Sequence, residues 1–294
     1  MNPAAMTPEA LAPLAALAAA AAFGAGVQAQ GRAVREMDAV AGALIGVTVA
    51  TLIFAAAAPF AVRPEWVFSE ATLWFALCGL FMPALSMILA IRSVGLAGPA
   101  LTASLGAVSP FFAVAPAVLL LGESIGPQAV AGLLLMTGGL AVSPFAGGRG
   151  VPRPALWILA LPLGAAALRG ASQAVAKVGL GIAPSPVWAA LVTFAVSALV
   201  LAVIAGPARI RAALRPGPGL AWFAVAGVCN GLGLLLLNAA LSGGDVVVAA
   251  PLASTAPLWT LAWGALVFGG ERVTLRHVGV AALVAAGAAL IVSR

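Results

Sequence analysis

One charged residue, Arg169, lies well inside an apolar stretch that is long enough to cross a membrane. A guanidinium at that depth must face a cavity or a partner, and its planar fork can bind a carboxylate through two parallel hydrogen bonds. Ser172 and Gln173 follow about one turn later and add hydrogen-bond donors and acceptors. This group predicts a binding site for a small solute that carries a carboxylate. The alternative is a structural arginine that snorkels or bonds backbone carbonyls.

Other polar residues at membrane depth extend this candidate site. The residues expected to line a pocket together with Arg169 and Gln173 are Ser104, Asn230, Asn238, Ser254, Thr255 and Trp259. Small polar side chains also hold membrane helices together, so each residue taken singly has a structural alternative. Pro110 and Pro257 interrupt two apolar stretches at depth, and we expect them to act as hinge or gating residues because proline removes a helical hydrogen bond.

The carboxylates lie at the expected ends of helices rather than at mid-depth. Glu123 and Glu271 each follow a glycine at the start of an expected helix, and Asp245 follows Ser242-Gly-Gly244 in the same way. A carboxylate at such a position binds free amides at the positive end of the helix dipole, so we predict structural caps. Lys177 is expected to anchor a helix end at the membrane interface. Facilitated diffusion or exchange is therefore favoured over proton-coupled antiport.

The sequence predicts no metal, no cofactor and no catalytic group. It contains one histidine, His277, and two cysteines, Cys78 and Cys229, each isolated in an apolar run. An integral-membrane enzyme would need a nucleophile, a base or metal ligands clustered at one depth. We therefore expect a protein that is not an enzyme. A non-transporting scaffold is a further alternative, which the lack of any long loop disfavours.

The elements that must position these residues are membrane-spanning helices. The 294-residue chain is 63% hydrophobic and only 7% charged, whereas a soluble domain is about 25% charged. The net charge of +6 reflects scarce acid rather than a basic surface, which excludes a nucleic-acid-binding module. Ten spans are predicted, at residues 9–30, 39–60, 71–91, 96–121, 127–145, 154–177, 186–206, 219–241, 246–268 and 274–293. Arg169 would lie about four residues past the centre of the sixth.

The chain repeats itself at an offset of about 148 residues. Trp74-Phe-Ala-Leu-Cys-Gly79 reappears as Trp222-Phe-Ala-Val-Ala-Gly227, and Ser109-Pro110 followed by Leu121-Gly-Glu123 reappears as Ala256-Pro257 followed by Gly269-Gly-Glu271. We predict an all-α integral membrane protein of ten helices, with one five-helix repeat at 1–146, a linker at 147–154 and a second repeat at 155–294. Because five is odd, the second repeat must be inverted, an arrangement typical of secondary transporters with a site at the midplane.

The repeated proline and Gly-Glu pattern, with a glycine-rich fifth helix in each half, resembles the EamA-type proteins of the drug/metabolite transporter superfamily. The resemblance covers essentially the whole chain. It implies a small-solute carrier, usually an exporter, in a bacterial inner membrane, with a central cavity and alternating access. Many members of the family carry Trp-Gly in the first helix, where this chain has Phe23-Gly24. Some amino-acid exporters of the family also carry aromatic residues in the third and fourth helices, and these are largely missing here. That departure disfavours a pocket specific for aromatic solutes.

We therefore expect an exporter of small organic metabolites, with amino acids favoured because Arg169 is nearly the only charge at depth. A phosphate carrier would need several Lys or Arg residues in its cavity. Carriers of sugar or nucleotide derivatives or of drugs are the alternatives. Expected partners are the solute and the lipid bilayer, with the chain monomeric. Ten arginines lie in the connectors after odd-numbered spans, which places both termini outside the cytoplasm, whereas the family resemblance implies termini inside.

Overall fold

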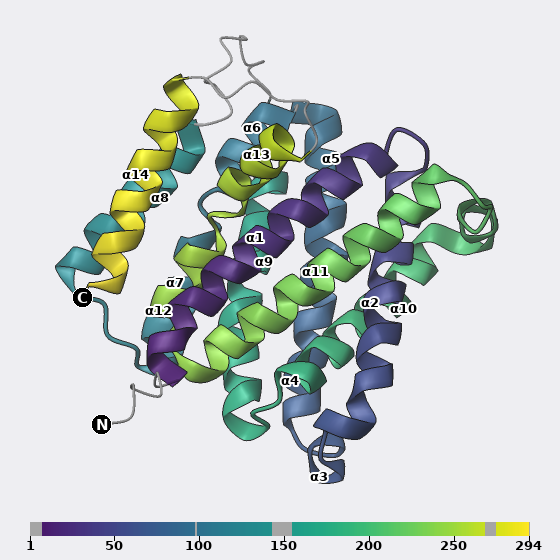
Figure 1. The fold of residues 1–294 in the computed structure, drawn as a ribbon, viewed down its shortest axis with the longest axis horizontal. Coiled ribbons are helices and arrows are strands. Elements are labelled where there is room, and N and C mark those ends of the chain that lie inside the picture. The colour runs from purple at the N-terminus through teal and green to yellow at the C-terminus, as the bar shows by residue number, and fades with distance from the viewer. Residues whose placement is uncertain (1–7, 98, 143–154, 268–274, 294) are drawn as a thin grey trace.

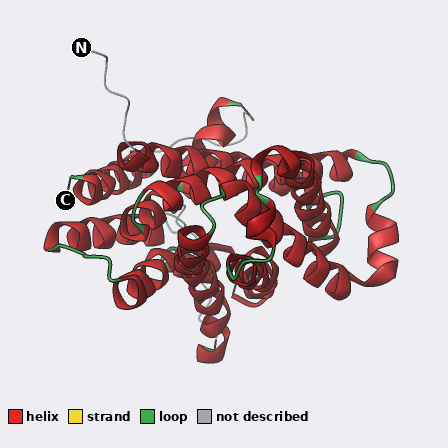
Figure 2. Cartoon of the chain, turned by 90° about the horizontal axis from the view of Figure 1, so that it is seen from below, coloured by secondary structure: helices red, strands yellow, loops and turns green. Residues whose placement is uncertain are grey.

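The computed structural model describes residues 8–97, 99–142, 155–267 and 275–293, and within these ranges all regular structure is helical (Figures 1 and 2). The first half contains α1 (Pro8–Ala33), α2 (Ala39–Ala61), α3 (Pro64–Val67), α4 (Ala71–Gly79), the π-helix η1 (Leu80–Leu85), α5 (Ser86–Ala97), α6 (Pro99–Gly106), α7 (Ser109–Leu121) and α8 (Pro127–Val142). The second half contains α9 (Leu156–Ile182), α10 (Pro186–Ala213), α11 (Pro218–Gly243), α12 (Val246–Ala253), α13 (Ala256–Leu266) and α14 (Leu275–Val292).

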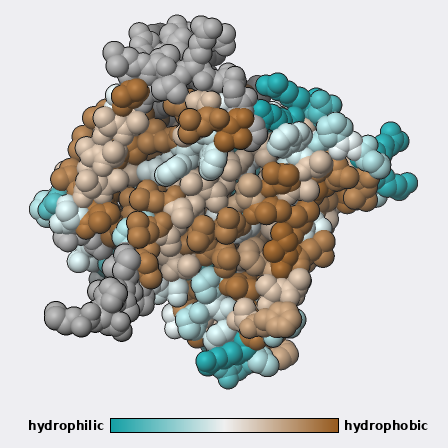
Figure 3. Space-filling view, viewed as in Figure 1, coloured by the Kyte–Doolittle hydropathy of each residue, from teal (hydrophilic) through white to brown (hydrophobic). Residues whose placement is uncertain are grey.

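Each predicted span corresponds to one helix or to a run of broken helices. Seven of these segments are long and apolar enough to cross a membrane, and Ser109–Leu121, Pro127–Ala141 and Val278–Val292 are shorter apolar helices. Large apolar side chains such as Leu119 and Val203 are 80% and 84% exposed. Figure 3 shows an apolar surface across the middle of the molecule, with hydrophilic side chains towards its ends. Such a surface fits lipid rather than water, so the chain is a multi-pass membrane protein.

Local signals in the sequence fix several helix ends. Asp38 accepts a hydrogen bond from the amide of Ala41 (3.0 Å) and starts α2, and Ser185 caps α10 in the same way. Gly122 ends α7 in the left-handed conformation at φ 69°. The prediction is wrong at the end of α9, which runs five residues past the expected 177, whereas the end expected at 206 coincides with a break in the structure. In α10 the backbone breaks at Gly206 (φ 72°), but the helix resumes beyond it.

Two spans are broken near their middle at symmetric positions. The fourth span breaks between α6 and α7, and Pro110 is the second residue of α7. The ninth breaks between α12 and α13, and Pro257 is the second residue of α13. Because proline lacks an amide hydrogen, Gly106 and Ala253, four residues earlier, lose their helical donor. The breaks therefore place polar backbone inside the bundle.

Close contacts between the two halves occur in pairs related by the repeat. A side chain at Gly79 of α4 would meet the carbonyl of Thr193 in α10, and one at Gly227 of α11 would meet the carbonyl of Gly46 in α2. Likewise, Gly170 of α9 lies against α7, and Gly24 of α1 lies against α13. Helices of each half thus pack closely against helices of the other half at glycine positions. The linker predicted at 147–154 and residue Glu271 lie outside the described residues.

Candidate functional site

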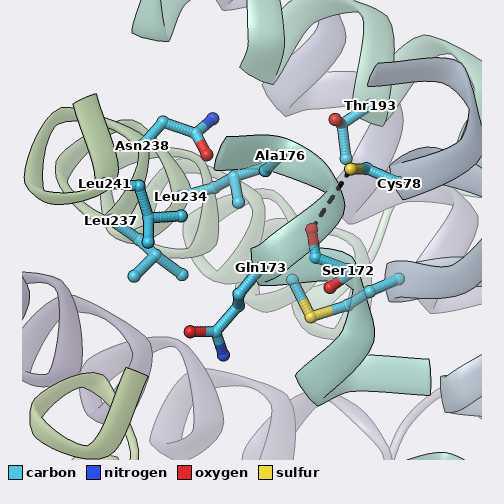
Figure 4. Close-up of a pocket in the computed structure, with 10 residues that line it drawn as sticks. Cys78, Ser172, Gln173, Ala176, Thr193, Leu234, Leu237, Asn238 and Leu241 are labelled. Atoms are coloured by element: carbon cyan, nitrogen blue, oxygen red, sulfur yellow. Dashed lines mark hydrogen bonds between the residues drawn. The ribbon is translucent and has the colours of Figure 1, made fainter. Parts of the chain in front are cut away.

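A small cavity lies between α4, η1, α9, α10 and α11 (Figure 4). Its free space, about 10 Å³, holds roughly one water molecule. The lining residues are Cys78, Met82, Ser172, Gln173, Ala176, Thr193, Leu234, Leu237, Asn238 and Leu241. Pockets for small molecules usually measure about 300–1,000 Å³, so this conformation is closed and the helices must part before an organic solute can enter.

Two of the predicted site residues, Gln173 and Asn238, face this cavity from opposite helices. Gln173 of α9 is 6% exposed and its buried Oε1 has no hydrogen-bond partner among the described residues. Asn238 of α11 is 2% exposed, and no hydrogen bond of its side chain is formed within the described parts of the chain. Buried amides are normally satisfied because an unpaired one costs roughly 1–3 kcal/mol. These two side chains are therefore available to a ligand.

Arg169 lies at the centre of α9, as the fourteenth of its 27 residues, rather than four residues past the centre as expected. Its side chain is exposed, and among the described residues it has no hydrogen bond or ion pair. Gln173 follows four residues later on the same helical face. Ala166 and Gln173, one turn to either side, are both buried. Arg169 is thus an exposed side chain between two buried positions of the same helical face.

The remaining polar side chains of the cavity wall donate hydrogen bonds to backbone carbonyls. The Cys78 thiol donates to the carbonyl of Ser172 (3.3 Å), and Thr193 donates to the carbonyl of Phe75 (3.3 Å). The Ser172 hydroxyl donates to the carbonyl of Arg169 (2.8 Å). These bonds tie α4 to α9 and α10 and leave Gln173 and Asn238 as the unpaired groups.

The cavity lining does not include the predicted site residues Arg169, Asn230, Ser254, Thr255 and Trp259. The hydroxyls of Ser254 and Thr255 bond to carbonyls of their own helix, Ala250 (2.9 Å) and Leu252 (2.7 Å), at the α12–α13 break. Asn230 lies against Gly26 of α1, where a side chain would come within 2.8 Å of its Oδ1. Trp259, 37% exposed, packs its Cβ against Gly24. The side chain of Ser104 lies outside the described residues.

The charged residues predicted as caps and anchors act between helices. Glu123 accepts the amides of Val246 and Val247 (2.9 Å each) and so caps α12 in the other half. The predicted cap of the helix that follows Glu123 in the chain is therefore wrong. Asp245 occupies the N-cap position of α12, but its side chain bonds no helix amide. Lys177 lies within α9 rather than at its end, and its Nζ donates to the carbonyls of Leu241 and Gly244 (2.7 Å each). No cluster of metal-ligating side chains occurs in the described ranges.

Sequence reasoning missed Cys78, Met82 and Thr193 as cavity residues. None of them differs from ordinary core residues in the sequence, because a buried thiol, thioether or hydroxyl usually fills space. Their positions along the repeat offered no further signal. The polarity of Ser172, Gln173 and Asn238 inside apolar runs was the signal that pointed to the cavity.

Comparison with known proteins agrees with this architecture. The family model of the EamA-like transporter family matches twice, at residues 10–143 and 155–293. Among 29 matching chains of solved structures, one crystal structure aligns with a TM-score of 0.78 and 20% sequence identity over 96% of both chains, which shows the shared fold. No curated protein matches the sequence. Because the two family matches cover nearly the whole chain, the protein belongs to the EamA-like transporter family of the drug/metabolite transporter superfamily.

Proposed function

We propose that this membrane transporter carries amino acids out of a bacterial cell across the inner membrane, through ten crossings arranged as two inverted repeats. The observation that carries the proposal is Arg169, an unpaired guanidinium at the centre of a membrane helix. An arginine at that depth costs about 2.5–3.5 kcal/mol on insertion scales. That cost is consistent with a functional role, because the described residues provide the guanidinium with no structural partner.

Arg169 and Gln173 together suit a zwitterion. The guanidinium supplies only donors, which match a carboxylate. The unpaired Oε1 of Gln173, one turn away, supplies an acceptor for an ammonium group. An α-amino acid carries both groups on neighbouring atoms, whereas a phosphorylated sugar needs several cations. Of the two cations on α9, Lys177 bonds backbone carbonyls and Arg169 has no hydrogen bond or ion pair among the described residues, which favours the amino acid.

Transport would follow by alternating access. Rocking of one repeat against the other would open the closed cavity first at one end and then at the other. The breaks beside Pro110 and Pro257 offer bending points in the fourth and ninth helices. No carboxylate at mid-depth is available for proton coupling among the described residues, so exchange or facilitated diffusion is the simpler mechanism.

Counterflow in proteoliposomes tests the proposal. Purified protein is reconstituted with unlabelled amino acids inside and labelled ones outside, and accumulation is compared with empty liposomes. We expect accumulation of neutral amino acids above the empty control. No accumulation of any amino acid by folded protein would exclude this substrate class, and sugar phosphates, nucleotide sugars and drugs would be assayed next.

Gln173→Leu is expected to remove recognition of the amine. We expect the KM for an amino acid to rise about tenfold, since a lost hydrogen bond to a charged group is worth roughly 1.5–3 kcal/mol. The KM for the matching acid without its amino group should not change. Competition in the counterflow assay measures both. Gln128→Leu is the matched control, because Gln128 lies on α8 and bonds only to Ser293. Equal losses for both solutes would remove Gln173 from amine recognition.

A further inference from the structure

The chain between α11 and α12, here called the α11–α12 junction (Leu241–Val247), is held by two charged side chains from elsewhere in the fold. Lys177 of α9 donates to the carbonyls of Leu241 and Gly244 (2.7 Å each). Glu123, which follows α7, accepts the amides of Val246 and Val247 (2.9 Å each). One cation thus binds the end of α11 and one anion binds the start of α12. Both match the helix dipoles.

This junction lies directly over one end of the cavity. Leu241 is fully buried and lines the cavity, so the carbonyl held by Lys177 belongs to a residue of the cavity wall. Lys177 itself follows Gln173 by one turn of α9. The junction is on the side where α1 begins and α14 ends, here called the termini end (Figure 1). The bonds of Lys177 therefore lie next to the cavity wall on the side of the termini end.

Glu123 makes this closure depend on both repeats. It belongs to the first repeat, whereas Lys177 and the junction belong to the second. A movement of one repeat against the other that opens the termini end must separate Glu123 from α12 or carry α12 with it. Glu123 and Lys177 are both half-buried, so water can replace their bonds when they separate. Charge-assisted bonds that can exchange with water suit a reversible contact.

The residue type at position 177 also fits this task. Lys177 is the single lysine among the 14 basic residues of the chain. Its compact ammonium can donate to two carbonyls that converge at a helix end, whereas the planar guanidinium of arginine matches carboxylates. The other basic residues of the chain, including those expected to anchor helix ends at the interface, are arginines. The lysine at position 177 is therefore suited to binding these two carbonyls.

We propose that Lys177 and Glu123 are positioning residues of the transport cycle, which hold the α11–α12 junction closed over the termini end of the cavity and release it when that end opens. The inference rests on the proposed function of alternating access. Its direct consequence concerns access to the cavity from one face of the membrane, which can be measured without any transported solute.

The cavity residue Cys78 provides a natural reporter. It is 4% exposed, lines the cavity and lies about two turns into its span from the termini end. A Cys229→Ala background leaves it as the single thiol. A membrane-impermeant maleimide is added to the termini face or to the opposite face of oriented vesicles. The variants are Lys177→Met, Glu123→Gln and the conservative Lys177→Arg. Glu65→Gln is the control, because Glu65 is exposed on the same face and pairs only with Arg63.

We expect Lys177→Met and Glu123→Gln to label at least about tenfold faster than the control from the termini face, a shift of about 1.4 kcal/mol towards the open end. Lys177→Arg should lie nearer the parent rate because it keeps the charge. Unchanged labelling, or equal acceleration from both faces, overturns the proposal. If Lys177→Met does not fold, Glu123→Gln decides alone. If Cys78 is labelled faster in these variants but the parent protein exchanges no amino acid in counterflow, the closure by Lys177 and Glu123 is supported and the proposed amino-acid transport is rejected.

Discussion

Arg169→Ala is expected to abolish transport of carboxylate-bearing solutes while leaving the fold as stable as before, or more so. Losing the positive partner of a desolvated carboxylate costs roughly 2–5 kcal/mol, which is about 30-fold or more in affinity. The stability of the protein should not fall, because the guanidinium has no partner among the described residues. Removing a charge at the membrane centre also relieves the cost of inserting it.

Counterflow and the thermal midpoint in detergent measure the two effects. Arg169→Lys should keep part of the activity, since it retains the charge but loses the bidentate geometry. Arg63→Ala is the control for an arginine on the surface, where the side chain is 72% exposed. A structural arginine would behave differently: its removal would lower the midpoint and slow all solutes alike. That result would exclude Arg169 from substrate binding.

The sequence predicts the helices well because long apolar runs leave few alternatives in a membrane. An error occurs where a charge was taken as a helix end. Lys177 lies within α9, because a helix can carry a charged side chain that reaches backbone carbonyls. The broken fourth and ninth helices were indicated by Pro110 and Pro257, since a missing amide is a local property of the residue.

The candidate site was predicted only in part. Arg169, Gln173 and Asn238 can be identified from the sequence because each is a polar residue inside an apolar run. Ser254 and Thr255 are equally polar, but their hydroxyls bond to their own helix, and sequence alone does not distinguish these two outcomes. Capping by Glu123 was expected from its position after Gly122. Its partner amides lie 123 and 124 residues away, and no local spacing identifies them.

The second large effect concerns Gly170, which sits beside Arg169 where α9 crosses α7. A methyl group there would overlap the carbonyl of Ser109 and come within 2.7 Å of the Cβ of Phe112. The atoms in the way are backbone and Cβ atoms of α7, which cannot rotate aside as the far end of a flexible side chain can. Gly170→Ala should therefore push α7 away from α9, at a cost of roughly 1–3 kcal/mol.

We expect the thermal midpoint of Gly170→Ala to fall by several degrees and counterflow to be lost, since the same crossing positions Arg169. Gly181→Ala is the matched control on the same helix, with nothing within 4 Å of the added carbon. It should be neutral or slightly stabilising, because alanine favours helix over glycine. Gly24→Ala, at the repeat-related crossing of α1 with α13, should lower the midpoint as Gly170→Ala does, since its Cβ would lie 2.7 Å from the amide nitrogen of Thr260. Equal midpoints for the Gly170 and Gly181 variants would show that this crossing does not need glycine.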